Sequence, residues 1–147
     1  MAFEFRLTRR VEFCDTDLAG IVHYANFFRY MEAAEHAFFR SLGFSVVTQR
    51  VDPPVGWPRV RAECDYRYPL LFEDLVEVRL LVCEKRSKSL GYAFRFRKLN
   101  STPVLEVARG KLTVVCVTHQ RGGRMTAASI PKAIADRIDV APPELLA

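Results

Sequence analysis

One helical pattern followed by four strand patterns leaves this chain few ways to fold. Between Tyr24 and Leu42 the apolar residues recur every three or four positions, the spacing of one face of an α-helix, and Gly43 is a natural stop. From residue 60 onward the apolar residues alternate instead, in four stretches at 60–68, 76–82, 90–96 and 104–119. Alternation is typical of half-buried strands, and a fifth such stretch precedes the helix at 3–13.

The short connections between the later strand patterns indicate the kind of sheet. No helix-length segment separates these patterns, and parallel neighbours need a crossover of that length, so the sheet is predicted to be largely antiparallel. The helix is rich in aromatic residues, which indicates that it is enclosed rather than merely docked. We therefore predict an α+β fold in which about five antiparallel strands wrap around one long central helix.

Two glycines and the C-terminal segment refine this prediction. The alternation of the last strand pattern is broken near Gly110, which predicts a β-bulge there, and Gly91 marks a second kink. Residues 139–147 contain two adjacent prolines and are expected to form a loose tail. The whole chain, 1–147, is expected to be a single domain.

The composition is that of an ordinary globular domain. The chain has 147 residues, of which 50% are apolar and 27% charged, enough for one core and too few for two ordinary domains. No stretch approaches the roughly 18 consecutive apolar residues of a membrane-spanning helix, and charged residues interrupt the N-terminal segment where a signal peptide needs an apolar run. We therefore expect a cytoplasmic protein. The net charge of +5 favours an anionic partner, without distinguishing nucleic acid, phosphorylated cofactors and lipid headgroups.

The segment from Phe13 to Phe28 carries the residues best suited to chemistry. It reads Phe-Cys-Asp-Thr-Asp-Leu-Ala-Gly-Ile-Val-His-Tyr-Ala-Asn-Phe-Phe and places two carboxylates, Asp15 and Asp17, shortly before the helix begins. The first amides of a helix have no intrahelical acceptor and carry the positive end of the helix dipole, so they suit an oxygen that becomes negative during acyl transfer. A carboxylate aimed at the same point can attack the carbonyl carbon or take a proton from water.

This segment resembles the active-site loop of hotdog-fold thioesterases of the 4-hydroxybenzoyl-CoA thioesterase type, which include the YbgC-like acyl-CoA thioesterases. Their shared pattern is D-x-D-x-x-G-(I/V)-V, followed by two aromatic or His positions and a small-x-aromatic step. The positions that fit are Asp15, Thr16, Asp17, Ala19, Gly20, Ile21, Val22, Tyr24 and Asn26. The resemblance extends over residues 5–139, because the order of strands, the central helix and the terminal Ile-Pro-x-x-Ile element also match.

The resemblance implies a hotdog fold and roles for particular residues. The catalytic carboxylate would be that of Asp17, and the helix-start amide that polarises the thioester carbonyl would be the backbone N–H of Tyr24. Without the surrounding pattern, Asp17 would more simply be a turn former or a helix cap. The loop residues expected to bind substrate are Gly20, Ile21 and Val22.

Two further residues are catalytic candidates with a structural alternative. YbgC-like enzymes commonly have an aromatic residue and then His where this chain reads His23-Tyr24, an order nearer the hydroxybenzoyl type, so His23 is either a pocket residue or a loop histidine. Glu35 lies near the apolar face of the helix. It is either a reserve catalytic carboxylate, as the resemblance to some hotdog thioesterases implies, or half of a structural ion pair.

A basic turn, Lys85-Arg86-Ser87-Lys88, joins two of the strand patterns. In related enzymes Arg and Lys in a matching turn bind the phosphates of coenzyme A, and charge-assisted contacts of this kind are physically reasonable. The alternative is a solvent-exposed hairpin whose charged residues only keep it soluble. The resemblance thus predicts Lys85, Arg86 and Lys88 as coenzyme A contacts.

The predicted function is that of an acyl-CoA thioesterase that releases the free acid and coenzyme A. No cofactor is expected because coenzyme A is part of the substrate, and no metal site is expected because the four cysteines lie far apart. The alternatives are a thioesterase acting on acyl carrier protein and a non-catalytic acyl-CoA-binding module; nucleic-acid binding is not expected. A sheet around one helix leaves an edge bare, so we expect a homodimer that pairs sheets edge to edge and associates into a tetramer.

Overall fold

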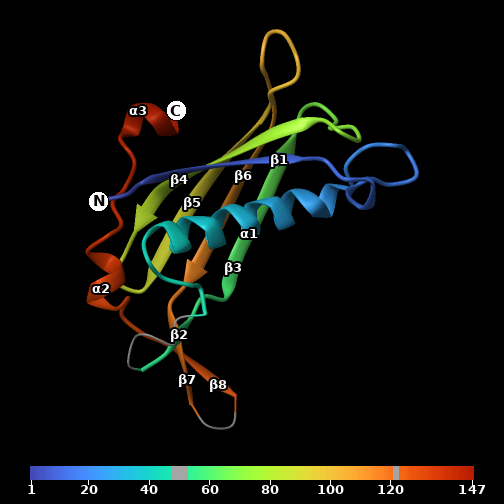
Figure 1. The fold of residues 1–147 in the computed structure, drawn as a ribbon. Coiled ribbons are helices and arrows are strands. Elements are labelled where there is room, and N and C mark those ends of the chain that lie inside the picture. Colours follow the sequence, from blue (N-terminus) through green and yellow to red (C-terminus); the bar gives the residue numbers. More distant parts are fainter. Residues whose placement is uncertain (48–52, 121–122) are drawn as a thin grey trace.

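The computed structural model describes residues 1–47, 53–120 and 123–147. It confirms the predicted antiparallel sheet of five strands with one long helix (Figure 1). In spatial order the strands are β1 (Glu4–Arg10), β4 (Leu75–Lys85), β5 (Ser89–Lys98), β6 (Leu105–Val115) and β3 (Arg59–Tyr66). A second, smaller sheet that the pattern did not predict has the order β2 (Val55–Gly56), β7 (Val117–Gln120) and β8 (Arg124–Ala127). The helical elements are η1 (Phe13–Asp15), α1 (Tyr24–Ser41), α2 (Lys132–Ala135) and α3 (Pro143–Leu146).

Helix α1 packs against one face of the five-stranded sheet. Met31, Ala34 and Phe38 are fully buried, as the helical spacing predicts. The buried face is broader than predicted, because Tyr30 and Phe39 are also almost completely buried while Phe28 is only half-buried. Each large apolar side chain removed from water contributes about 1.5–3 kcal/mol, so α1 is stabilised mainly by its contact with the sheet.

Gly110 lies where α1 approaches the sheet, and the bulge predicted near it falls three residues earlier, at Val107, where the register of β6 with β5 shifts. The register of β6 with both neighbouring strands runs regularly through Gly110. A Cβ atom at this position would lie 2.8 Å from the sulfur of Met31, so the glycine leaves room for the helix rather than bending the strand. The kink predicted near Gly91 does coincide with a register shift, which falls between Val82 and Glu84 on the neighbouring strand β4.

The C-terminal segment is folded, contrary to the loose tail expected for residues 139–147. Ala141 is 2% exposed, and its N–H donates to the carbonyl oxygen of Val82 (2.8 Å). Helix α3 then packs its two leucines against Leu81 and Ala93, on the face of the sheet opposite α1. The adjacent prolines begin this helix instead of preventing one, because a residue without an N–H loses nothing at a helix start.

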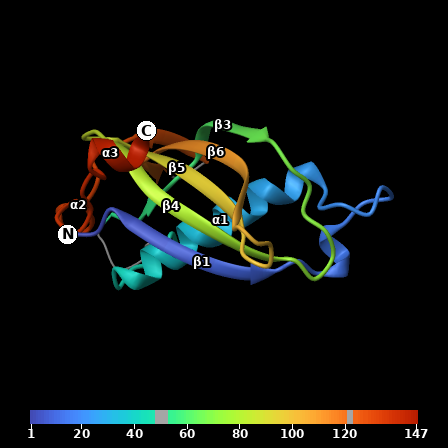
Figure 2. The ribbon, with the colours of Figure 1, turned by 90° about the horizontal axis from the view of Figure 1, so that it is seen from above.

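The two ends of the molecule carry different features. Figure 2 shows the loop that joins β1 to α1 at one end, and the N-terminus and α2 at the other. Strand β3 forms one edge of the five-stranded sheet, and most of its residues are exposed. No helix within the described ranges is long and apolar enough to cross a membrane.

Candidate active site

The loop between η1 and α1 is a compact turn closed by Gly20. The N–H of Gly20 donates to the carbonyl oxygen of Asp17 (3.0 Å), and the N–H of Asp17 donates to that of Ile21 (2.9 Å). Gly20 has a φ of 80°, a conformation that other residues rarely adopt, which explains a glycine at this position. The Asp17 carboxylate also accepts a hydrogen bond from the N–H of Ala19 (2.8 Å). The turn therefore holds the Asp17 side chain in one place.

Asp15 ties this loop to α1. One of its carboxylate oxygens accepts hydrogen bonds from the hydroxyl of Tyr30 and from the N–H of Glu12, both at 2.9 Å. Its carbonyl oxygen accepts from the side-chain amide of Asn26 (2.8 Å) and from the N–H of His23 (2.9 Å). The two aspartates of the motif thus differ: Asp15 is structural and organises the loop in which the second aspartate lies.

The start of α1 leaves one backbone donor free. His23 is the N-cap: its Nδ1 accepts from the N–H of Ala25 (3.1 Å), and its carbonyl oxygen accepts from the N–H of Asn26 (2.8 Å). Within the described residues the N–H of Tyr24 has no protein acceptor, so it is available at the positive end of the helix. The exposed ring of His23 stacks on that of Tyr24, with centroids 4.6 Å apart. The contacts of His23 are those of a cap, and its catalytic role stays a prediction.

A hollow of about 440 Å³ is lined both by Asp17 and by Tyr24, the first residue of α1. It is lined by Asp17, Ile21, Val22, Tyr24, Phe27, Tyr66, Arg67, Tyr68 and Pro69. Asp17 and Tyr24 thus face the same space, the juxtaposition that acyl transfer at one carbonyl group requires. Of the loop residues expected to bind substrate, Ile21 and Val22 line this hollow, while Gly20 shapes the turn beside it.

The end of β3 forms the opposite wall of the hollow, and the sequence motif did not include it. The hydroxyl of Tyr66 donates to the carbonyl oxygen of Tyr24 (2.9 Å), and the Tyr66 ring meets that of Phe27 edge-on (5.0 Å between centroids). Burial and the neighbouring Cys64 raise the pKa of Tyr66 to about 12, so its hydroxyl remains a donor at neutral pH. Because 42 positions separate Tyr66 from Tyr24, no local pattern could have found this contact.

Glu35 lies far from the hollow. It is fully buried in α1, about 16 Å along the helix axis from Tyr24, and its carboxylate pairs with the Arg59 guanidinium at the start of β3 (Nη1 to Oε2, 3.4 Å). Burial raises the pKa of Glu35, and the positive charge of Arg59 offsets part of that shift. The structure therefore supports the ion-pair alternative for Glu35.

The basic turn of Lys85, Arg86 and Lys88 lies at the opposite end of the sheet from Asp17. Strand β4 spans this separation with 11 residues, about 35 Å. The Lys85 ammonium donates to two carbonyl oxygens around the end of α2, at 2.7 and 2.8 Å, and the Arg86 guanidinium pairs with Glu84 (2.6 Å). One chain alone does not bring this turn to Asp17, so the expected coenzyme A contact would require a second chain.

A family model for the thioesterase-like superfamily matches residues 11–138, and the chain belongs to this superfamily. Its fold is the hotdog fold that solved thioesterase structures share. Within this superfamily its relatives are of the 4-hydroxybenzoyl-CoA thioesterase and YbgC types, which confirms the resemblance seen in the loop motif.

Three known proteins show the extent of the similarity. The chain is 31% identical over 91 residues to 4-hydroxybenzoyl-CoA thioesterase of Pseudomonas sp. (strain CBS-3), covering 60% of this chain and 64% of that enzyme. It is 27% identical over 130 residues to acyl-CoA thioesterase YbgC of Haemophilus influenzae, covering 88% and 90%. A crystal structure of an Asp-to-Asn mutant of 4-hydroxybenzoyl-CoA thioesterase with 4-hydroxybenzoyl-CoA superimposes with a TM-score of 0.82 and 26% identity, covering 92% of this chain and 99% of that one.

For two relatives the match covers less than two thirds of the relative's own length. A protein from Aquifex aeolicus (strain VF5) is 44% identical to this chain over 80 residues, which make up 60% of that protein. The match to the Pseudomonas enzyme covers 64% of that enzyme. These partial matches agree with the superfamily, and they leave the substrate of this chain to the chemistry of its own site.

Proposed function

We propose that this chain hydrolyses acyl-CoA thioesters, with Asp17 as the catalytic carboxylate and the Tyr24 N–H as the oxyanion donor. The observation that supports this proposal is that Asp17 and Tyr24, whose N–H has no protein acceptor among the described residues, line one hollow. The thioester oxygen binds at the Tyr24 N–H, where the helix dipole favours the negative charge that develops. One oxyanion donor typically contributes about 3 kcal/mol of transition-state stabilisation, so the amide and the carboxylate are both needed.

The reaction consumes one water and needs no resident cofactor. The carbon–sulfur bond of the thioester breaks, a carbon–oxygen bond forms, and coenzyme A leaves as a thiolate that takes up a proton. Asp17 acts in one of two ways. As a nucleophile, its carboxylate attacks the carbonyl carbon and gives an anhydride that water then opens; as a general base, it takes the proton of the attacking water. Either way coenzyme A arrives and leaves as part of the substrate.

A panel of thioesters tests this function. The aromatic wall made by Phe27 and Tyr66 suits a flat or short acyl group, so thiol release from benzoyl-CoA or butyryl-CoA should exceed that from palmitoyl-CoA by about tenfold or more in kcat/KM. The same acyl groups on acyl carrier protein provide the comparison of carriers. Binding of the esters without thiol release would identify a non-catalytic module and overturn the proposal, and faster release from the carrier protein would move the substrate class to that carrier.

We also propose that the chain forms a homodimer through β3, and that dimers associate into a tetramer. The edge of β3 that faces away from β6 has no strand partner within the described residues, and Val60 is 62% exposed. Tyr66 and Tyr68, at and just beyond the other end of β3, are about half exposed while lining the hollow, so a partner along the whole of β3 would cover the site. Light scattering at micromolar concentration should give a molecular mass that is a multiple of the monomer mass. Val60→Asp should lower this mass, and the surface control Val140→Asp should leave it unchanged. A monomer mass for the unmodified chain would contradict this proposal.

A further inference from the structure

Four arginines lie directly opposite one another across four strands of the main sheet. The register pairs Arg6 with Arg79, Arg79 with Arg95, and Arg95 with Arg109, so this arginine row runs across β1, β4, β5 and β6. Residues that pair in this way share a face, and the row lies on the face opposite α1. Like charges directly opposite one another destabilise a sheet, so the row needs negative charge nearby.

Carboxylates of the same chain neutralise three members of the row. Glu4 accepts from Arg79 (2.7 Å), and Glu106 pairs with Arg109. Glu77 lies 3.7 Å from Arg6, although it is also paired with the neighbouring Arg97 at 3.1 Å. These contacts leave the centre of the row, on β5, without a carboxylate side chain as its partner.

Arg95 occupies that centre and is the most enclosed member of the row. It is 8% exposed, and its Nη2 donates to the carbonyl oxygen of Leu145 in α3 (3.4 Å) and to a main-chain oxygen of Ala147, the last residue of the sequence (3.2 Å). No Asp or Glu side chain within the described residues pairs with Arg95. Burial lowers the pKa of Arg95, and the neighbouring charge of Arg109 acts in the same direction while Glu106 opposes it.

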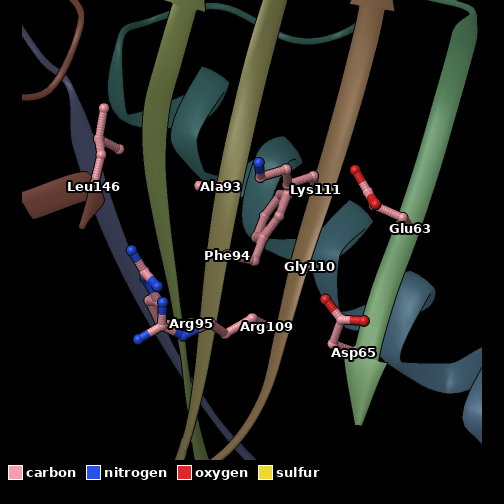
Figure 3. A pocket seen from close by; sticks show the side chains of 9 residues that line it. All are labelled: Glu63, Asp65, Ala93, Phe94, Arg95, Arg109, Gly110, Lys111 and Leu146. Carbon is pink, nitrogen blue, oxygen red and sulfur yellow. The ribbon is translucent and has the colours of Figure 1, made fainter.

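A hollow of about 220 Å³ opens beside Arg95. The residues that line this arginine hollow are Arg6, Arg79, Arg95, Arg97, Glu106, Arg109, Leu145 and Ala147. Five arginines therefore line this space together with Glu106 and the last residue of the sequence, Ala147. The neighbouring hollow in Figure 3 shares Arg95 and Arg109 but adds Glu63 and Asp65 of β3, so its charge is mixed and suits an anion less well.

The arginine hollow adjoins the candidate active site. Glu106, which lines the arginine hollow, lies 3.4 Å from the guanidinium of Arg67, and Arg67 lines the hollow of Asp17. Asp65, next to Tyr66, is in register with Arg109, and Arg95 is one strand further. Two strand spacings correspond to about 10 Å across the sheet. Because the arginine row lies on the face opposite α1, an extended substrate arm from the hollow of Asp17 would pass around the end of β3 to reach it.

We propose that the arginine hollow is a phosphate-binding site centred on Arg95, which takes the diphosphate or monophosphate groups of a nucleotide. One guanidinium group can bind two oxygens of a phosphate group at the same time. A bound polyanion would add negative charge beside Arg95 at the centre of the row. The nucleotide has two chemical sources: the coenzyme A part of the substrate, which rests on the proposed thioesterase function, and a free nucleotide or diphosphate that binds independently of it.

Calorimetric titration with inorganic diphosphate tests the site without reference to catalysis. The unmodified chain and Asp17→Asn should bind diphosphate equally, and Arg95→Gln should weaken binding by about tenfold or more. The matched control is Arg61→Gln, which removes an exposed charge from β3 on the same face. If Arg95→Gln has a lower melting temperature than the unmodified chain, Arg109→Gln serves as the second variant and should also weaken diphosphate binding. Equal affinity in the Arg95 variant and the control, or no binding to the unmodified chain, would overturn the proposal.

Kinetics with two forms of the substrate distinguish the two sources. If the coenzyme A of the substrate occupies the hollow, Arg95→Gln should raise KM for acyl-CoA by about tenfold at unchanged kcat, and leave KM for the S-acyl-pantetheine ester, which lacks the nucleotide, unaltered. Diphosphate should then compete with acyl-CoA. If a free nucleotide occupies it, diphosphate binds with the same dependence on Arg95 but does not compete. A chain without thioesterase activity that still binds diphosphate through Arg95 would refute the proposed function and keep the phosphate site.

Discussion

Replacing Asp17 by asparagine should lower the turnover of acyl-CoA by about 10²–10⁴-fold, the range of a lost general base or nucleophile. An amide can neither attack the thioester carbonyl nor accept the proton of water. Its carbonyl oxygen can still accept the hydrogen bond from the N–H of Ala19, so the turn around Gly20 should persist. Thiol release measured with saturating substrate reports this loss directly.

The control for this substitution is Asp136→Asn, which removes the same charge from an exposed ion pair on α2. Its turnover should stay within about twofold of the unmodified chain, because exposed pairs of this kind contribute little. Melting temperature and oligomeric state should be the same in both variants. Equal turnover of Asp17→Asn and Asp136→Asn would remove Asp17 from the mechanism.

Replacing Arg59 by methionine should have the largest effect on stability, with a loss of about 3–5 kcal/mol in the free energy of unfolding. Arg59 is the cationic partner of Glu35, whose side chain is fully buried, and its removal leaves a carboxylate without an opposite charge in the core. Urea denaturation measures this loss. The double variant Arg59→Met with Glu35→Gln removes the buried charge as well, so it should recover much of the stability; a double variant as unstable as Arg59→Met would refute the ion-pair explanation.

This loss should depend on pH. The groups around the Glu35 carboxylate are Arg59, the buried hydroxyl of Tyr92, and on α1 the side chains of Glu32 and His36. Burial raises the pKa of Glu35 in the folded state, so the folded chain keeps a proton that the unfolded chain has released.

The sign follows from linkage. At pH values below the pKa of the unfolded state, a raised pKa in the folded state does not change the free energy of unfolding. The free energy of unfolding then falls as the pH rises from there through the folded-state pKa. Methionine at position 59 removes the charge that opposes this shift, which raises the folded-state pKa of Glu35 further. The destabilisation by Arg59→Met should therefore be larger at about pH 8 than at about pH 5. The same loss at both values would show that Glu35 does not carry the effect.

Local patterns predicted the parts of the fold and the site that local physics determines. The helical spacing identified α1 within one residue at its end, and alternation identified the strands of the main sheet. The loop motif indicated Asp17 and the amide of Tyr24, because a glycine turn before a helix start places both within a few residues of each other. The capping contact of His23 is equally local.

Other features were decided by tertiary structure, because their local patterns have two physical meanings. A glycine inside a strand marks either a bulge or a close approach, and at Gly110 only the position of Met31 distinguishes them. Adjacent prolines end some helices and begin others. Here they begin α3, because the leucines of this helix pack against the apolar surface around Leu81. The expected coenzyme A contact of Lys85 stays a prediction, and only the tertiary structure shows that its ammonium donates to carbonyl oxygens around the end of α2.

The amino-acid order alone thus determined the class of fold, the loop and the aspartate to test, because turns, caps and periodicity depend on residues about ten positions apart or fewer. Tertiary structure alone decided that Tyr66 closes the hollow beside Tyr24, that Arg59 reaches Glu35, and that Arg95 stands in a row of arginines. Each of these contacts depends on the strand order β1-β4-β5-β6-β3 and on its register. Register is set by the packing of whole faces, and it brings together side chains that no spacing along the chain connects.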